Sequence, residues 1–223
     1  MKTTASMRLS LAAYALVFAA LCGLAGTPAR AQGAKALPPG VDLAAFTAER
    51  AVGRADAPVT IIEYASLTCS HCADFYKNVY PQLDRDYIQT GKVRLIYRVF
   101  PTNEPAVEAA AMARCASPMR YFPLLKAIFD KQNQIIAAAQ RAGREGWRRE
   151  LALIGMAAGL SPDLANACMT NETLLNEVVA GSMKAQTQWN ITGTPTFIFN
   201  DGKARLSGVP YEEFKRTIDR LLN

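Results

Sequence analysis

Residues 59–72 have the sequence VTIIEYASLTCSHC, in which an apolar run leads directly into a pair of cysteines. The first seven residues are almost continuously apolar and rich in β-branched side chains, which predicts a buried strand. Thr68 is a candidate N-cap for a helix that begins at Cys69. We expect this helix to continue to about Thr90, with a kink at Pro81, where the backbone lacks an N–H donor.

The same patterns predict further elements on either side of this stretch. Residues 93–100 form a second apolar run, so strand, helix and strand follow one another within about 42 residues and predict a parallel βαβ unit. Residues 104–189 are rich in Ala, Leu, Met and Gln, which indicates several short helices and no strand. The remaining expected elements are strands at 46–52, 196–199 and 204–207 and an amphipathic helix at 212–222. The chain is therefore predicted to fold as one split α/β domain with a helical insert.

Composition and charge exclude several classes of protein. The chain has 223 residues, of which 50% are hydrophobic and 20% are charged, a balance typical of globular domains and not of disordered chains. The formal net charge is +6, but three basic residues lie among the first 31 residues, which include no acid. The rest is only mildly basic, so we expect no nucleic-acid partner. A single histidine, His71, excludes any site that needs several imidazoles.

The N-terminus has the pattern of a signal peptide. Lys2 and Arg8 precede an apolar run over 9–25, and small residues precede an expected cleavage site after Ala31. An uncleaved membrane anchor and a lipoprotein attached at Cys22 are the alternatives. Export predicts a periplasmic location, where disulfides persist. Cleavage leaves four cysteines, which allow three pairings.

The strongest chemical indication is the motif Cys69-Ser70-His71-Cys72. Free N–H groups and the dipole at a helix start stabilise an anion, so the pKa of Cys69 is expected to fall below about 8.5. A protonated His71 would add positive charge. We expect Cys69 to be the exposed, attacking sulfur and Cys72 to resolve the mixed disulfide. A purely structural disulfide is the alternative, but so short a loop restricts the unfolded chain little.

Glu63 is the other candidate for chemistry. It lies in the predicted buried strand, six residues before Cys69, and a buried carboxyl is costly unless it has a partner or a function. Beneath the dithiol it would take and return the proton of Cys72 through water. A hydrogen-bonded Glu at the sheet margin is the alternative, with Tyr97 or Arg98 as candidate neighbours. Strand alternation alone does not settle its direction.

Several of these features together resemble a known family. The C-x-x-C motif that opens a helix after a strand, the late motif Gly193-Thr194-Pro195-Thr196 and the closing ββα resemble the thioredoxin fold. The helical insert, the signal peptide, Glu63 and His71 resemble the DsbA-like disulfide oxidoreductases. The resemblance covers about 45–222, nearly all of the expected mature chain.

The resemblance implies a thioredoxin-like α/β fold, βαβ plus ββα, with an inserted all-helical domain. Its parts would be a signal peptide at 1–31, a linker at 32–44, a first half at 45–102, a helical insertion at 103–189 and a second half at 190–223. Some relatives carry a second disulfide in the helical domain, which here would join Cys115 to Cys168. Two buried thiols are the alternative.

The resemblance also implies the geometry of the site. The residues alone favour a trans Thr194–Pro195 bond, because only about 5–6% of X–Pro bonds are cis. In the family this bond is cis, with Pro195 facing Cys69 and Cys72 and Thr194 presenting its backbone to an extended substrate peptide. Two residues depart from the best-known oxidase: Ser70 replaces a proline and Thr194 replaces a valine. Thr before the proline is frequent in isomerases and reductases of this fold.

The function implied is a monomeric oxidase of reduced or unfolded exported proteins. It would need a DsbB-like membrane partner to reoxidise it, and neither an organic cofactor nor a metal. An isomerase or reductase of the same fold is the first alternative. A copper or zinc protein with Cys69, His71 and Cys72 as ligands is the second, although a closed zinc site needs four ligands. Phe75 or Tyr76, if exposed beside the site, are candidates to hold unfolded substrate.

Overall fold

The computed structural model of the chain describes residues 36–208 and 210–223, in which five strands form one mixed sheet. The strands are β1 (Arg50–Val52), β2 (Val59–Ala65), β3 (Val93–Val99), β4 (Thr196–Phe199) and β5 (Ala204–Leu206). Their order across the sheet is β1-β3-β2-β4-β5. The predicted signal peptide at 1–31 and the first part of the predicted linker lie outside the described residues.

The pairing of the strands brings the two halves of the domain together. β2 and β3 are parallel, and the other neighbouring strands are antiparallel. The late strand β4 pairs with β2, so the loop before β4 lies beside the loop that follows β2. The result is the expected βαβ plus ββα arrangement with helices inserted between β3 and β4.

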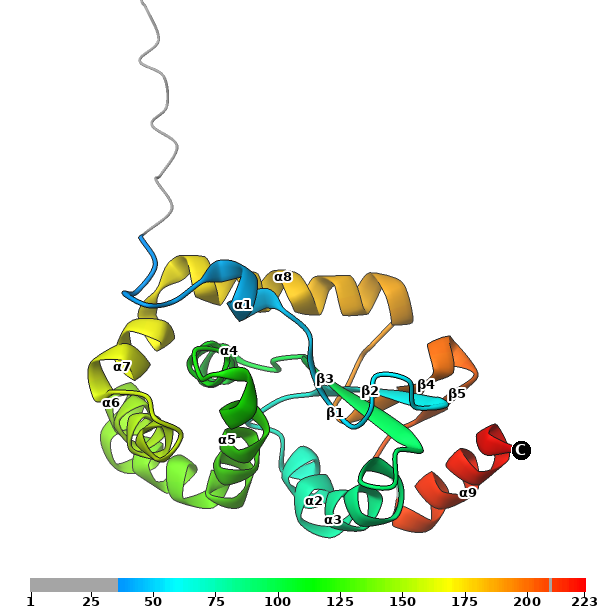
Figure 1. Cartoon of the computed structure of the whole chain (residues 1–223). Helices are drawn as coiled ribbons and strands as arrows, with labels where there is room; N and C mark the ends of the chain where they lie inside the picture. The colour runs from blue at the N-terminus through cyan, green and yellow to red at the C-terminus, as the bar shows by residue number, and fades with distance from the viewer. Residues whose placement is uncertain (1–35, 209) are drawn as a thin grey trace, which may run out of the picture. The chain divides into compact units, whose positions relative to one another are not determined.

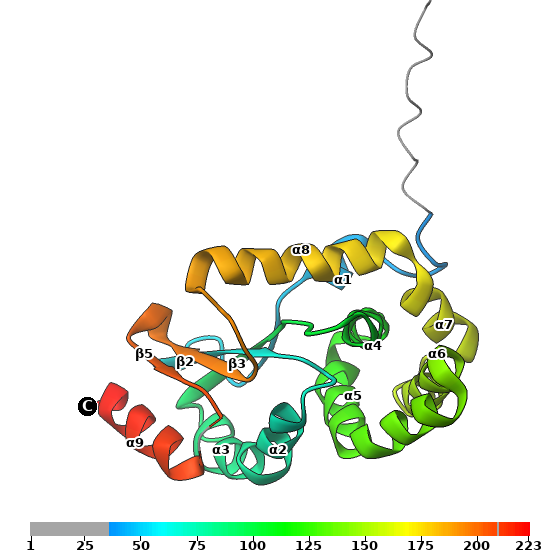
Figure 2. The same cartoon turned by 180° about the vertical axis from the view of Figure 1, so that it is seen from behind.

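Helices cover both faces of the sheet. They are α1 (Leu43–Thr47), α2 (Ser70–Asn78), α3 (Tyr80–Leu83), the π-helical turn η1 (Asp84–Ile88), α4 (Glu104–Arg114), α5 (Pro118–Asp130), α6 (Gln132–Ala157), α7 (Pro162–Thr170), α8 (Glu172–Trp189), the 3₁₀ turn η2 (Asn200–Gly202) and α9 (Tyr211–Leu222). Figure 1 shows α2, α3 and α9 against one face of the sheet and α8 across the other. The opposite view in Figure 2 shows the same layers, with α4 to α7 gathered beside the sheet.

Each face of the sheet carries its own apolar cluster. Ile61 and Ala65 of β2 face the larger cluster, which includes α2 and α9, whereas Ile62 and Tyr64 face a smaller cluster that includes α8. Because side chains alternate along a strand, Glu63 lies on the same face as Ile61 and Ala65, beneath α2. The sheet thereby places a carboxyl in the larger apolar core.

The inserted helices are joined to one another by turns and a disulfide. α6 consists of two helical segments that meet at Ala142 and Gly143, where the backbone is not helical and φ of Gly143 is +56°. The side chain of Gln134 in the first segment donates a hydrogen bond to Glu150 in the second, so the segments lie side by side. A disulfide joins Cys115 at the end of α4 to Cys168 in α7.

Two local expectations were wrong at element boundaries. Residues 46–52 are not one strand, because the side chain of Asp42 accepts a hydrogen bond from Ala45 N at 2.7 Å and starts helix α1 before β1. The expected helix over 69–90 is broken at Val79, two residues before Pro81.

Pro81 lies in the first turn of α3, where its missing N–H leaves no hydrogen bond unmade. Cys69, and not Thr68, is the N-cap of α2. Among the described residues, no helix combines the length and apolar character needed to cross a membrane.

Candidate active site

The two cysteines of the motif lie at the start of α2 in very different surroundings. Cys69 is the N-cap residue, with extended backbone (φ −84°, ψ 121°), and its side chain is half-buried. Cys72 lies one turn further on and is fully buried. The two thiols are unbonded in this structure. The accessible sulfur is therefore that of Cys69, as the sequence predicts.

The pKa values of the two thiols are shifted in opposite directions, as their different burial suggests. A hydrogen bond from the Cys72 thiol, together with the Thr194 side chain and the backbone N–H groups of Cys72 and His71, lowers the pKa of Cys69 to about 5 although burial opposes the change. Burial raises the pKa of Cys72. At neutral pH the site therefore holds a thiolate at Cys69 and a neutral thiol at Cys72.

The Thr194–Pro195 peptide bond is cis and lies against this pair. In its protonated form, the thiol of Cys69 donates a hydrogen bond to the Thr194 carbonyl at 3.3 Å, across 125 positions of sequence. Ser207 Oγ donates to the Pro195 carbonyl at 2.9 Å and ties the loop to the segment after β5. The pairing of β4 with β2 is what brings the late proline loop to the early cysteines.

Glu63 is fully buried and hydrogen-bonded on the face beneath α2. The hydroxyl of Tyr76 donates to Glu63 Oε2 at 3.0 Å, and burial raises the pKa of Glu63 to about 8 in spite of this bond. The Glu63 carboxylate contributes to the raised pKa of Cys72. The carboxyl is thus protonated at neutral pH and lies within electrostatic reach of the buried thiol.

Of the two expected neighbours of Glu63, only Tyr97 lies beside it. Tyr97 is paired with Glu63 in the parallel ladder of β2 and β3, and it is fully buried. Arg98 points to the opposite face, where it donates to the Tyr64 hydroxyl at 3.1 Å. Tyr76, which the sequence suggested as an exposed substrate contact, is the direct partner of Glu63.

The aromatic residues that follow the motif are arranged differently from expectation, whereas His71 lies at the surface. The His71 side chain is exposed and lines a cavity of about 220 Å³ with Asp74 and Phe197. Phe75 and Tyr76 are only 4% and 1% exposed, so neither offers a surface for unfolded substrate. They are buried because the inner side of α2 packs its rings against Phe197 and other aromatic side chains.

Polar side chains around the loop before Cys69 were not found from the sequence. Ser66 Oγ lies 3.0 Å from Thr102 Oγ1, at the ends of β2 and β3. Gln132 Nε2 donates to the carbonyls of Leu67 and Cys69, both at 3.1 Å. The hydroxyl residues that follow β2 could have indicated the contact between Ser66 and Thr102. Nothing in the sequence around Gln132 indicates its contact with the loop before Cys69.

Within residues 36–208 and 210–223, no group of three or more His, Cys, Asp or Glu side chains is arranged to hold a metal ion.

Comparisons with known proteins agree on one family. A family model described as Thioredoxin matches residues 46–220. The crystal structure of Wolbachia pipientis alpha-DsbA1 is 29% identical, with a TM-score of 0.68, and the match covers 83% of this chain and 92% of that one. Disulfide bond formation protein D of Bacillus subtilis is 26% identical over 175 residues, which are 77% of this chain and 76% of that protein.

A relative from Rickettsia bellii, provisionally named a protein-disulfide oxidoreductase, is 27% identical over 149 residues. These residues are 67% of this chain but 56% of the relative, so the chain spans little more than half of that protein.

Proposed function

This chain belongs to the thioredoxin family, and we propose that it is a DsbA-like thiol:disulfide oxidoreductase that introduces disulfides into exported proteins. The family match and the likeness to alpha-DsbA1 confirm the predicted fold. The observation that carries the proposal is the acidic, accessible thiol of Cys69, hydrogen-bonded to the cis-proline loop and backed by a buried Cys72.

The reaction begins with Cys69 and Cys72 joined as a disulfide. A substrate thiolate attacks Sγ of Cys69, which forms a mixed disulfide and releases Cys72 as a thiolate. A second substrate thiolate then attacks the substrate sulfur of the mixed disulfide and releases Cys69. The substrate loses two electrons and gains a disulfide, and the protein gains both electrons as a dithiol. The low pKa of Cys69 favours its release, because a more acidic thiol leaves faster.

Glu63 supplies the proton that this scheme requires. The thiolate of Cys72 forms in a fully buried place, where a charge is costly. Glu63, protonated at neutral pH, donates its proton towards Cys72 through water and recovers it afterwards. His71 contributes its backbone N–H to the stability of the Cys69 thiolate, and we propose that its exposed imidazole adds charge when protonated.

The substrate peptide lies along the cis-proline loop. Thr194 offers its backbone N–H and C=O to an extended chain, in the manner of an added β-strand. The partners that we propose are reduced or unfolded exported proteins and a DsbB-like membrane protein that reoxidises the dithiol. The protein would act as a periplasmic monomer without cofactor, metal or nucleic acid, after cleavage of residues 1–31. We propose the same division of the chain into parts that the sequence predicts, with the helical insertion at 103–189.

A direct assay tests the proposal. The oxidised protein is mixed with a reduced, unfolded protein that has two cysteines, and the loss of free substrate thiols is followed. Cys72→Ala has no disulfide to give, so it is mixed instead with the oxidised form of the same substrate. Its Cys69 thiolate should attack the substrate disulfide, release one substrate thiolate and remain as a mixed disulfide that mass spectrometry detects, whereas Cys69→Ala should form none. Equal substrate oxidation by the wild type and Cys69→Ala would refute the assignment.

Thr194 favours a second candidate, an isomerase or reductase, because this residue type precedes the proline in many such proteins. Measurement of the reduction potential and of the mass in solution by light scattering separates the two. A strongly reducing potential together with a stable oligomer would replace the oxidase with this second candidate.

A further inference from the structure

The inserted helices contact the loop that carries Cys69 at two points. Gln132, the first residue of α6, is 5% exposed and donates from Nε2 to the carbonyls of Leu67 and Cys69 at 3.1 Å. Thr68 Oγ1 donates to Asn103 Oδ1 at 3.3 Å, and Asn103 is the N-cap of α4. The loop from β2 to α2 is therefore held from outside by the first residues of two inserted helices.

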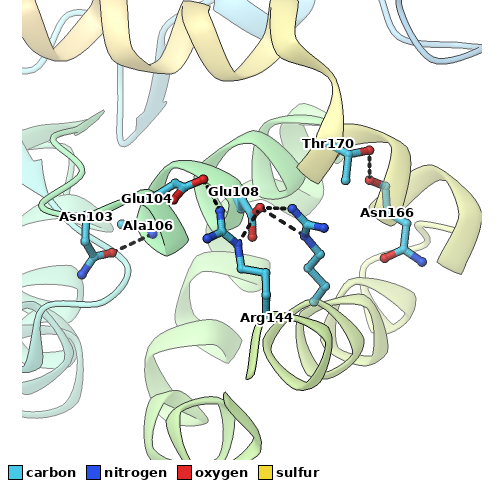
Figure 3. A network of polar contacts seen from close by, with 8 residues as sticks. Asn103, Glu104, Ala106, Glu108, Arg144, Asn166 and Thr170 are labelled. Carbon is cyan, nitrogen blue, oxygen red and sulfur yellow. Dashed lines mark hydrogen bonds and ion pairs between the residues drawn. The ribbon is translucent and has the colours of Figure 1, made fainter. Parts of the chain in front are cut away.

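These two inserted helices are themselves fastened together. Glu108 on α4 is 1% exposed, and its carboxylate accepts hydrogen bonds from Arg144 Nε at 3.0 Å and Arg148 Nε at 3.1 Å. Figure 3 shows Glu108 and Arg144 facing each other between the helices, with Asn103 at the start of α4. Because the two segments of α6 lie side by side, the contacts of the buried Glu108 carboxylate with Arg144 and Arg148 also hold the segment that begins with Gln132.

We propose that Gln132 is a positioning residue for the dithiol: its amide holds the carbonyls of Leu67 and Cys69 in place and offsets their negative charge beside the reactive sulfur. The inference rests on the proposed function, because it concerns the same site. A carbonyl oxygen carries partial negative charge and disfavours a thiolate near it, and a hydrogen bond from an amide N–H compensates that charge. The same bonds also hold the loop directly before the helical turn whose N–H groups, those of His71 and Cys72, lower the pKa of Cys69.

Removal of the Gln132 amide therefore destabilises the thiolate without touching either sulfur. Gln132→Met keeps the length and bulk of the side chain and removes the donor. The expected result is a rise of about half a unit to one unit in the pKa of Cys69, as one modest hydrogen bond allows. The disulfide becomes less oxidising in the same variant.

The test compares Gln132→Met with Gln140→Met, which changes an exposed glutamine on the same helix. The pKa of Cys69 is measured from the ultraviolet absorbance of the thiolate, and thermal unfolding is recorded for each variant. Gln132→Leu is the second probe: its side chain also has no hydrogen-bond donor, so the pKa of Cys69 should rise about as far as in Gln132→Met.

A pKa of Cys69 in Gln132→Met and Gln132→Leu equal to that of the wild type would overturn the inference, whatever the loss of thermal stability. An equal rise in Gln140→Met would do the same. The titration needs no substrate, so it is independent of the oxidase assay. A wild type that oxidises no thiols, but whose Cys69 responds to Gln132→Met, would remove the proposed function and leave this inference standing.

Discussion

Replacement of Glu63 with Gln should make the reduced protein more stable at alkaline pH while it slows substrate oxidation. Burial raises the pKa of Glu63 from its ordinary 4.5 to about 8. At about 1.36 kcal/mol per pKa unit, the ionised carboxylate costs the fold roughly 5 kcal/mol above pH 8. This is an upper bound, because water and side chains relax around a buried charge. Gln accepts the same hydrogen bond from Tyr76 and carries no charge.

The direction with pH follows from proton binding. Between pH 4.5 and about 8 the folded chain keeps a proton on Glu63 that the unfolded chain has released. The free energy of unfolding of the wild type therefore falls as pH rises through this window. The variant has no such pH dependence at this position. The free energy of unfolding of the variant minus that of the wild type should therefore be near zero below pH 4.5 and should grow to several kcal/mol above pH 8.

Urea unfolding of the reduced wild type and of Glu63→Gln, at pH values from 4 to 9, measures this difference. Glu145→Gln, at an exposed position of α6, is the control and should show no growing gap. At pH 7 the loss of the proton donor should slow substrate oxidation roughly 100-fold. Stability curves for Glu63→Gln and the wild type that stay parallel across the range would refute the reasoning about a buried, protonated carboxyl.

Three further changes test the rest of the structure. The double variant Cys115→Ala/Cys168→Ala opens a loop with a sequence separation of 53; it should lower the free energy of unfolding by about 4 kcal/mol in urea and leave substrate oxidation intact. An unchanged urea midpoint would argue against the disulfide. Glu108→Gln should cost about 2 kcal/mol through its lost charged hydrogen bonds, and a midpoint within error of the wild type would contradict the ion-pair assignment. Tyr76→Phe removes the donor to Glu63 and should raise the pKa of that carboxyl further, which infrared spectroscopy of the carboxyl band would show; a lowered pKa would be the contrary result.

Features set by near neighbours in the chain were accessible from the sequence. The strand at 59–65 and the dithiol at a helix start depend on groups within a few residues. The low pKa of Cys69 depends mostly on the nearby Cys72 thiol, but Thr194, 125 positions away, also contributes. The boundaries were less accessible: a side-chain cap from Asp42 turned the start of an expected strand into a helix, and the helix after Cys69 broke before Pro81. Local contacts of this kind compete with each other over small free-energy differences.

The positions of the other side chains of the site depend on the tertiary structure. A strand that is apolar on both faces gives no alternation from which to place Glu63, so its direction waited for α2 to pack over β2. Nothing in the sequence around Tyr76 tells whether its side chain faces solvent or the carboxyl of Glu63. Gln132 lies more than sixty positions from Cys69, and the cis-proline loop more than a hundred, so their meeting depends on how strands and helices pack. Contacts between residues so far apart in the chain form because the complete core is buried in one particular packing. No short stretch of sequence determines that packing.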